Sequence, residues 1–268
     1  MKRSIWETPG TLAEKFWRTG KAPFPIYDMH GHMGEHYAIH FKIHTPAQVV
    51  EHVKRIGVKH LVFSHHHTLM GGLLRNEKVV DMCREFPDTL RLYVGIVPKL
   101  ADLVREDLKN FDRFRPFAIG LKMLGTYHVP TLGDPAYEYA YAFANERKLP
   151  VLLHTWGKDE TLLPLIQKYP DIRFFLGHSC FGAWEYAERC VKESAGNVYL
   201  ELTALPGMRG LIENLVARVG SEKLLFGTDM PWFDEYQAVG GVLAAEISDE
   251  DKFNILSGNA EKILGTDW

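Results

Sequence analysis

Cysteine is scarce in this sequence of 268 residues, and the three cysteines form no motif. Cys83, Cys180 and Cys190 are odd in number and show no C-x-x-C spacing. This argues against a disulfide framework and against a cysteine-rich zinc site. We expect reduced thiols, at least two of them in the core.

A dominant charge and long apolar runs are missing as well. The chain carries 31 Lys and Arg against 34 Asp and Glu, a balance that disfavours nucleic acid and anionic membranes as partners. No apolar run approaches the length of about 20 residues that a transmembrane helix needs. The basic start of the chain also lacks the apolar segment of a signal peptide. We therefore expect a cytoplasmic protein.

What the chain does contain is a repeated pattern of a short apolar run followed by an amphipathic stretch, which is typical of α/β folds with a parallel sheet. Eight such units fit a closed (β/α)8 barrel, the TIM barrel, better than an open sheet. No linker or low-complexity segment interrupts them, so we expect a single domain over residues 1–268. The predicted strands are Pro25–His32, His60–His65, Leu90–Pro98, Phe117–Leu124, Pro150–Trp156, Arg173–Cys180, Asn197–Ala204 and Lys223–Pro231.

Helices are predicted between these strands, and a helical C-terminus follows the last one. Thr45-Pro46 resembles an N-cap followed by proline in the first turn, and Gly57 and Gly220 stand where C-cap glycines belong. The predicted helices are Ala47–Ile56, Leu73–Phe86, Ala101–Lys109, Pro135–Lys148, Thr161–Tyr169, Ala183–Glu193 and Leu211–Val219.

Histidine is the unusual component, because ten of the 13 histidines lie between His30 and His67. Barrel enzymes carry their chemistry at the C-terminal ends of strands. Four predicted strands end in polar groups of this kind: the first in His30 and His32, the others in His154, His178 and Asp229. Such a set, buried without a metal, would leave several polar groups desolvated at about 1–3 kcal/mol each.

The pair His30 and His32 is two residues apart, so both side chains should face the barrel interior and share one ion. Gly31 would keep the space between them open, and Asp28, on the same face, would orient one imidazole. Imidazole nitrogens with one carboxylate suit Zn²⁺, and Mn²⁺ or Fe²⁺ less selectively. The sequence therefore predicts one divalent metal ion.

In order and strand position, these residues resemble the amidohydrolase superfamily, in particular its amidohydrolase-2 branch of metal-dependent TIM-barrel hydrolases and decarboxylases. The resemblance spans nearly the whole chain. It rests on Asp28-Met29-His30-Gly31-His32, Gly120-Leu121-Lys122, Leu153-His154, Gly177-His178, Gly227-Thr228-Asp229-Met230-Pro231-Trp232 and the closing segment Ser257–Gly265.

For mononuclear members, the resemblance implies that His30, His32, His154 and Asp229 bind the metal. His178 stays unligated and acts on the metal-bound water or on the substrate, and Asp229 also accepts the proton of that water. Lys122 leaves an alternative open. In binuclear relatives, a lysine at this position is carboxylated and bridges two ions, whereas mononuclear members often have a lysine there for substrate or for a neighbouring acid. We favour one metal.

The loops after the strands should form the substrate pocket. Our candidates for substrate binding are Lys122, His65, Tyr127, Trp156 and Arg209. Arg209 and Lys122 would pair with a carboxylate on the substrate. For Arg209 the alternative is a place on the surface, and for the triplet that begins at His65 it is a histidine-rich flexible loop. Trp232 and Phe233 either wall the pocket or pack against the last helix.

The leading functional prediction is hydrolysis of a small lactone, ester or amide, with metal-activated water attacking a carbonyl. The alternative is non-oxidative decarboxylation of an aromatic or unsaturated carboxylic acid. A third prediction, a catalytically dead barrel that serves as a binding module, is disfavoured because every expected ligand and the expected base are present. Partners are a small-molecule substrate and, as in many barrels of this kind, a second subunit in a homodimer.

Overall fold

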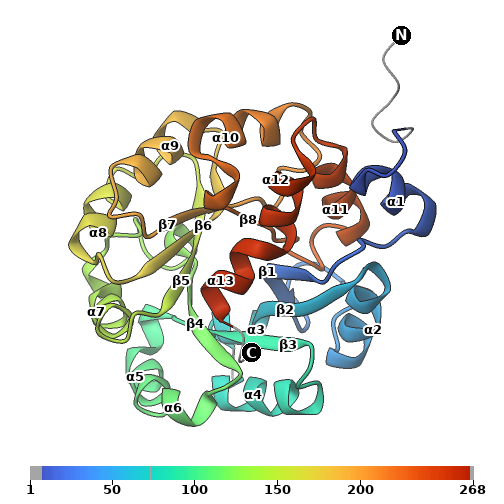
Figure 1. Cartoon of the computed structure of the whole chain (residues 1–268). Coiled ribbons are helices and arrows are strands. Elements are labelled where there is room, and N and C mark those ends of the chain that lie inside the picture. Colours follow the sequence, from blue (N-terminus) through green and yellow to red (C-terminus); the bar gives the residue numbers. More distant parts are fainter. Residues whose placement is uncertain (1–7, 73, 266–268) are drawn as a thin grey trace.

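The computed structural model describes residues 8–72 and 74–265. Eight parallel strands stand in the order β1 to β8, each hydrogen-bonded to the next. Beyond β8 the chain bonds to β1: the amide of Met29 donates to the carbonyl of Phe226 at 2.9 Å, and the amide of Asp229 donates to the carbonyl of His30 at 2.6 Å. The sheet thereby closes as the predicted (β/α)8 TIM barrel, ringed by helices (Figure 1).

All eight predicted strands are present. Their bounds are β1 Ile26–Met33, β2 Val58–His65, β3 Leu90–Gly95, β4 Ala118–Met123, β5 Pro150–Trp156, β6 Arg173–Phe181, β7 Val198–Glu201 and β8 Leu224–Leu225.

Strands β7 and β8 are shorter than predicted, because the predictions ran to Ala204 and Pro231. The backbone leaves the ladder at their ends, and Ala204 and Asp229 adopt left-handed φ angles of 67° and 59°. Such angles lie outside the β region of backbone conformation, and neither residue takes part in the ladder. The residues assigned to these strand ends therefore belong to loops at the mouth of the barrel.

The helices follow the predicted order, with α1 and the short α3 and α6 as additions. Thr45 caps α2 through the amide of Gln48, and Gly57 ends the helix with a left-handed φ of 102°. The prediction Leu73–Phe86 begins at a residue outside the described ones, and the described helix is α4. The α-helices are α1 Leu12–Thr19, α2 Pro46–Ile56, α3 His66–Leu69, α4 Asn76–Glu85, α5 Ala101–Lys109, α6 Phe111–Phe114, α7 Glu138–Glu146, α8 Leu162–Lys168, α9 Trp184–Lys192, α10 Leu211–Val219, α11 Glu235–Ala244, α12 Asp249–Phe253 and α13 Asn259–Leu264.

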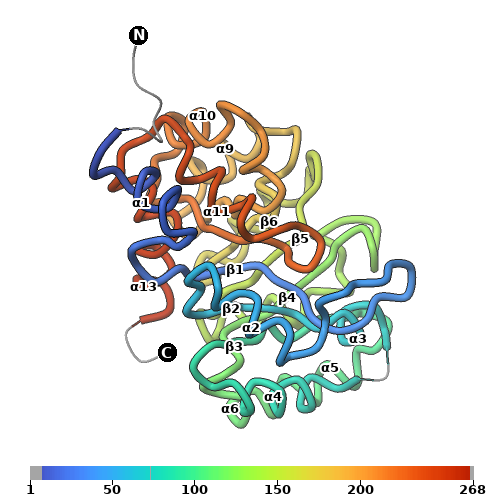
Figure 2. The backbone as a smooth tube through the Cα atoms, turned by 90° about the vertical axis from the view of Figure 1, so that its right-hand side faces the viewer, coloured from blue at the N-terminus to red at the C-terminus, as the bar shows by residue number. Residues whose placement is uncertain are grey.

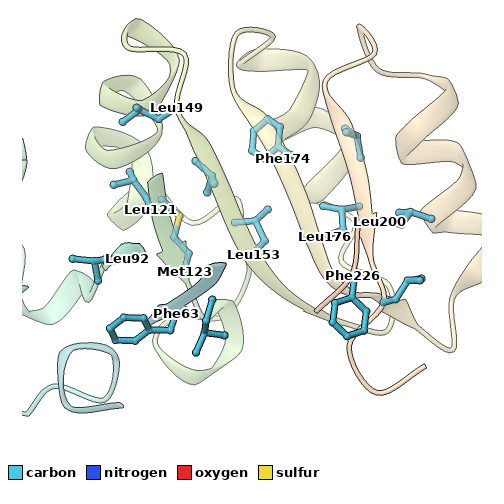
Figure 3. Close-up of a cluster of buried hydrophobic side chains, with 14 of the residues drawn as sticks. Phe63, Leu92, Leu121, Met123, Leu149, Leu153, Phe174, Leu176, Leu200 and Phe226 are labelled. Carbon is cyan, nitrogen blue, oxygen red and sulfur yellow. The ribbon is translucent and has the colours of Figure 1, made fainter. Parts of the chain in front are cut away.

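Two apolar clusters hold the barrel together. The larger one lies between the strands and the surrounding helices, where side chains such as Phe174 and Leu176 point away from the barrel axis (Figure 3). The smaller one fills the barrel interior and includes Tyr93, Leu152 and Phe175.

Helix α13 covers the end of the barrel at which the strands begin. Its residues Ala260 and Leu264 belong to the interior cluster, and Glu261 accepts a hydrogen bond from the hydroxyl of Tyr27 at 3.0 Å. The loop that follows β1 lies at the opposite end (Figure 2). The end at which the strands terminate is not covered in this way, and a cavity opens there. In residues 8–72 and 74–265, no helix combines the length and the apolar character needed to cross a membrane.

Replacing Leu152 by Ala should destabilise the barrel by about 2–5 kcal/mol, because this side chain is fully buried in the interior cluster and its removal leaves a cavity. The same change at Leu103, which is 41% exposed, should alter stability by less than about 0.5 kcal/mol. Urea unfolding of both variants measures the difference. Equal effects of the two changes would contradict the assignment of Leu152 to the core.

Candidate metal centre and substrate cavity

A cavity of about 480 Å³ opens at the end of the barrel where the strands terminate. Imidazoles and Asp229 form part of its lining, and aromatic rings form much of the rest. The lining residues are His32, His66, Met70, Leu124, Thr126, Tyr127, His154, Trp156, His178, Asp229, Trp232 and Phe233.

Three of the four predicted metal ligands meet at one point beside this cavity. His30, His32 and Asp229 are buried, and one ligand atom from each lies within 4.8 Å of the other two. Oδ1 of Asp229 is 3.3 Å from Nε2 of His30 and 2.9 Å from Nε2 of His32. We call these three residues the metal group.

The spacing of the metal group fits a divalent cation. Two ligands held about 2.1 Å from one ion, at an angle of about 90–109°, lie roughly 3.0–3.4 Å apart. The two separations to Asp229 are close to this range. Burial alone would raise the pKa of Asp229, but the imidazoles of His30 and His32 hold it well below its usual value. Asp229 is therefore a carboxylate, the form that binds a metal.

Strict alternation along β1 does not explain how both histidines reach this point. Tyr27 and Met29 belong to the interior cluster. With strict alternation, His30 and His32 would then point away from the barrel interior. The pairing of β1 with β2 shifts register between Asp28 and Gly31, and such an irregularity re-aims the side chains that follow. The expectation for Gly31 was wrong, since an added Cβ would meet Leu61 at 2.6 Å and not the space between the histidines.

Each imidazole of the metal group is anchored through Nδ1. Nδ1 of His30 lies 2.7 Å from Oε2 of Glu201, and Nδ1 of His32 lies 3.2 Å from the carbonyl of Ser64. Because both partners are acceptors, Nδ1 carries the proton in each ring and Nε2 keeps its lone pair for a metal. Burial, with Lys122 nearby, also holds the pKa of His30 well below its usual value.

Glu201 is the site residue that the sequence reasoning missed. It is fully buried at the end of β7, and Thr203 donates both its amide and its hydroxyl to Oε1, at 2.7 and 2.6 Å. Burial raises the pKa of Glu201 to about 7. A carboxylate at the end of an otherwise apolar strand was the available signal, and it was read only as part of the strand. Glu201 takes the place beside an imidazole that was expected for Asp28.

Asp28 instead holds the backbone. Its Oδ1 accepts hydrogen bonds from the amides of His30 and Thr228, both at 3.1 Å, and its Oδ2 accepts from the Thr228 hydroxyl at 2.6 Å. Among the described residues, Asp28 forms no hydrogen bond with an imidazole ring. The expectation that Asp28 orients a ligand ring was therefore wrong.

His154 and His178 form a second pair beside the metal group. Nδ1 of His154 lies 3.2 Å from Nε2 of His178, and His154 is not one of the three residues that converge within 4.8 Å. Burial lowers the pKa of His154 to about 2 and that of His178 to about 4. Both rings are thus neutral at pH 7.

His178 has two further features of a functional group. Its φ angle is 65°, a left-handed conformation that costs about 1–3 kcal/mol and persists where the surrounding structure imposes it. Its Nδ1 is buried without a hydrogen-bond partner in the described part of the chain. A buried polar atom of this kind needs an explanation, and a ligand in the adjoining cavity would supply one.

Comparison with known protein families shows the family to which this barrel belongs. Residues 27–266 match the profile of an amidohydrolase family, amidohydrolase-2. The chain belongs to the amidohydrolase family. No curated protein matches its sequence.

Several solved structures share the fold of this amidohydrolase. A 2,6-dihydroxybenzoate decarboxylase from Rhizobium gives a TM-score of 0.69 at 13% identity, covering 91% of this chain and 99% of that one. The 5-carboxyvanillate decarboxylase of Novosphingobium aromaticivorans, solved with manganese and 4-hydroxy-3-methoxy-5-nitrobenzoic acid, gives 0.69 at 12%, covering 90% and 96%. A protein described as amidohydrolase II gives 0.68 at 18%, covering 89% and 99%. At these identities the likeness shows the fold.

Lys122 of the amidohydrolase lies beneath the metal group and not in the cavity lining. It is fully buried, and its Nζ is 2.8 Å from Nε2 of His30. Burial lowers the pKa of Lys122 to about 8. Contact with a cavity-bound substrate, as first expected, is therefore not supported, and the carboxylated form with two ions stays a prediction.

The other substrate candidates divide in two. Tyr127 and Trp156 line the cavity. His65 does not, because its ring lies against Gly34, and the next residue, His66, lines the cavity in its place. Arg209 is exposed and is not among the residues that line the cavity. It therefore lies on the surface, which was the alternative expected for it.

Changing Glu201 to Gln should weaken metal binding about 10- to 100-fold, because a neutral amide replaces the carboxyl group that fixes the tautomer of His30. Competition with a chromophoric chelator measures the dissociation constant for Zn²⁺. The exposed residue Glu77, changed to Gln, serves as the control and should bind as the wild type does. An unchanged constant in the Glu201 variant would remove this residue from the site.

Proposed function

We propose that this amidohydrolase-family enzyme is a metal-dependent, non-oxidative decarboxylase of a small aromatic carboxylic acid. The observation that carries the proposal is the cavity beside the metal group: its walls include Tyr127, Trp156, Trp232 and Phe233, and no Lys or Arg is among the described residues that line it. An aromatic ring finds apolar surfaces there. The charged partner available to its carboxylate would be the ion held by the metal group, with the imidazoles beside it.

The residues proposed to hold the ion are His30, His32 and Asp229, with His154 as the fourth ligand that the family resemblance implies. A mixed imidazole and carboxylate set suits Zn²⁺ and Mn²⁺. When bound, a divalent ion supplies positive charge that orients the substrate and stabilises developing negative charge. The manganese in the structure of a 5-carboxyvanillate decarboxylase with the same fold supports this assignment.

Decarboxylation breaks the bond between the ring and its carboxylate. The electron pair of that bond stays on the ring carbon, which takes up one proton from solvent as CO₂ leaves. His178, which is neutral beforehand, is proposed to relay that proton: it accepts one from water and passes one to the carbon. Its buried Nδ1 has no hydrogen-bond partner in the described part of the chain, and its other nitrogen contacts His154. Burial raises the pKa of Asp229, but the nearby imidazoles lower it by more. Asp229 therefore stays ionised and serves as a ligand.

The metal group alone suits hydrolysis as well, and the sequence placed hydrolysis first. Two observations favour the carbon–carbon lyase. The apolar cavity walls provide neither a second carboxylate nor a cation at the substrate, and structures of two decarboxylases of hydroxylated benzoic acids share this fold over nearly the whole chain.

We expect the enzyme loaded with Mn²⁺ or Zn²⁺ to release CO₂ from ortho-hydroxybenzoic acids in a substrate panel, and to incorporate no oxygen from isotopically labelled water. Chelation should abolish turnover, and adding the metal back should restore it. Changing His178 to Asn should lower kcat about 100-fold or more, because proton delivery is lost. Incorporation of labelled oxygen, without CO₂, would establish hydrolysis instead.

Changing Trp156 to Ala should raise KM for the best substrate, because one wall of the cavity is removed. Changing Arg209 to Ala should leave both KM and the metal content unaltered, since this exposed residue lies outside the cavity lining. Steady-state kinetics on the two variants decides the matter. A higher KM in the Arg209 variant would show that the loop after β7 reaches the substrate.

A further inference from the structure

Three near-parallel rings connect the metal group to the loop that follows β1. The imidazole of His66 stacks on that of His32, with ring centroids 5.1 Å apart and planes 14° apart. It also stacks on Phe41, at 5.4 Å and 16°. Phe41 comes from the loop between β1 and α2, and His66 is the first residue of α3, directly after β2. We call these three rings the ring stack.

Both nitrogens of His66 are already occupied. Nδ1 lies 2.8 Å from the carbonyl of Gly34 and donates to it, while Nε2 accepts from Nε1 of Trp232 at 3.2 Å. This pattern requires the neutral tautomer with the proton on Nδ1. His66 is therefore free neither to bind a metal nor to carry a proton, although it lines the cavity.

The position of His32 depends on more than its own hydrogen bond. His30 is held at Nδ1 by the carboxyl group of Glu201 at 2.7 Å. His32 has the neutral carbonyl of Ser64 at 3.2 Å from its Nδ1 and Oδ1 of Asp229 at 2.9 Å from its Nε2. Both contacts lie at the ring nitrogens, so they leave the plane of the ring free to turn about the line that joins Nδ1 and Nε2. A flat ring stacked against the imidazole removes that freedom.

The same contacts join three loops around the metal group. Trp232, which follows β8, contacts the rings of Phe41 and of His36 at 4.9 Å each, and it donates to His66. The loops after β1, β2 and β8 are thereby connected at one point. The strands β1 and β8 lead directly to the three residues of the metal group.

We propose that His66 is a positioning residue of the metal centre, which fixes the plane of the His32 imidazole through the face of its own ring. Trp232 and Gly34 hold His66 in place, and Phe41 extends the ring stack into the loop above the cavity. The proposal rests on the metal site described under the proposed function, but not on the reaction.

The test compares Zn²⁺ dissociation constants of the full-length wild type and three variants, measured by chelator competition. His66→Ala removes the stack and should weaken binding about tenfold, the lower end for groups that orient a metal ligand. His66→Phe keeps a flat ring without the two hydrogen bonds and should recover most of that loss. His67→Ala, at an exposed neighbouring position, should bind as the wild type does.

Three results would overturn the proposal: an unchanged constant for His66→Ala, a loss in His66→Phe as large as in His66→Ala, or an equal loss in His67→Ala. If His66→Ala does not fold, Phe41→Ala replaces it and should weaken binding by a smaller factor, with no change counting against the proposal. A wild type that binds no divalent ion would contradict the metal site itself. If the variants bind Zn²⁺ in the expected order of affinity but the wild type releases no CO₂, the role of His66 is supported and only the proposed reaction is rejected.

Discussion

The hydrogen bonds of the buried Asp28 carboxylate hold β1 against the segment that follows β8, and the metal group depends on this contact. Asp28 accepts from the amides of His30 and Thr228 and from the Thr228 hydroxyl. Strand β8 has only two residues in its ladder, so the regular sheet constrains this seam weakly. The Asp28 side chain therefore acts together with the backbone hydrogen bonds from the amides of Thr228 and Asp229 to the carbonyl of His30 to set the distance between His30 and Asp229, which are 199 positions apart in the sequence. A metal tolerates displacements of only about 0.5 Å.

The remaining constraints act on the orientation of single rings. Glu201 holds His30 by a charged acceptor, and the face of His66 holds His32 by stacking. Two glycines allow the crowding around His30: a Cβ at Gly177 would meet its ring at 3.1 Å, and one at Gly227 would meet its Cβ at 2.7 Å. In the motifs Gly177-His178 and Gly227-Thr228-Asp229, the glycine thus leaves room for His30, and a functional residue follows it within two positions.

Backbone strain is concentrated in the same place. His178 and Asp229 both have positive φ angles, at about 1–3 kcal/mol each, and both line the cavity. The apolar clusters of the barrel supply the rigid surroundings that such strain requires. The cavity is lined by fixed polar groups and by aromatic rings, and the proposed function rests on this combination.

The sequence by itself determined the barrel and the ends of the strands that carry His30, His32, His154 and His178, whereas Asp229, expected in the eighth strand, lies in the loop after β8. Alternation of apolar runs and amphipathic helices is a local property, and each strand end can be found without knowing its neighbours. Only the tertiary structure decided which side chains meet. The register shift in β1, the buried carboxylate of Glu201, the choice of His66 over His65 and the surface position of Arg209 all depend on contacts between segments distant in sequence. Such contacts leave no periodic signal, because they are set by how eight strands close around one interior.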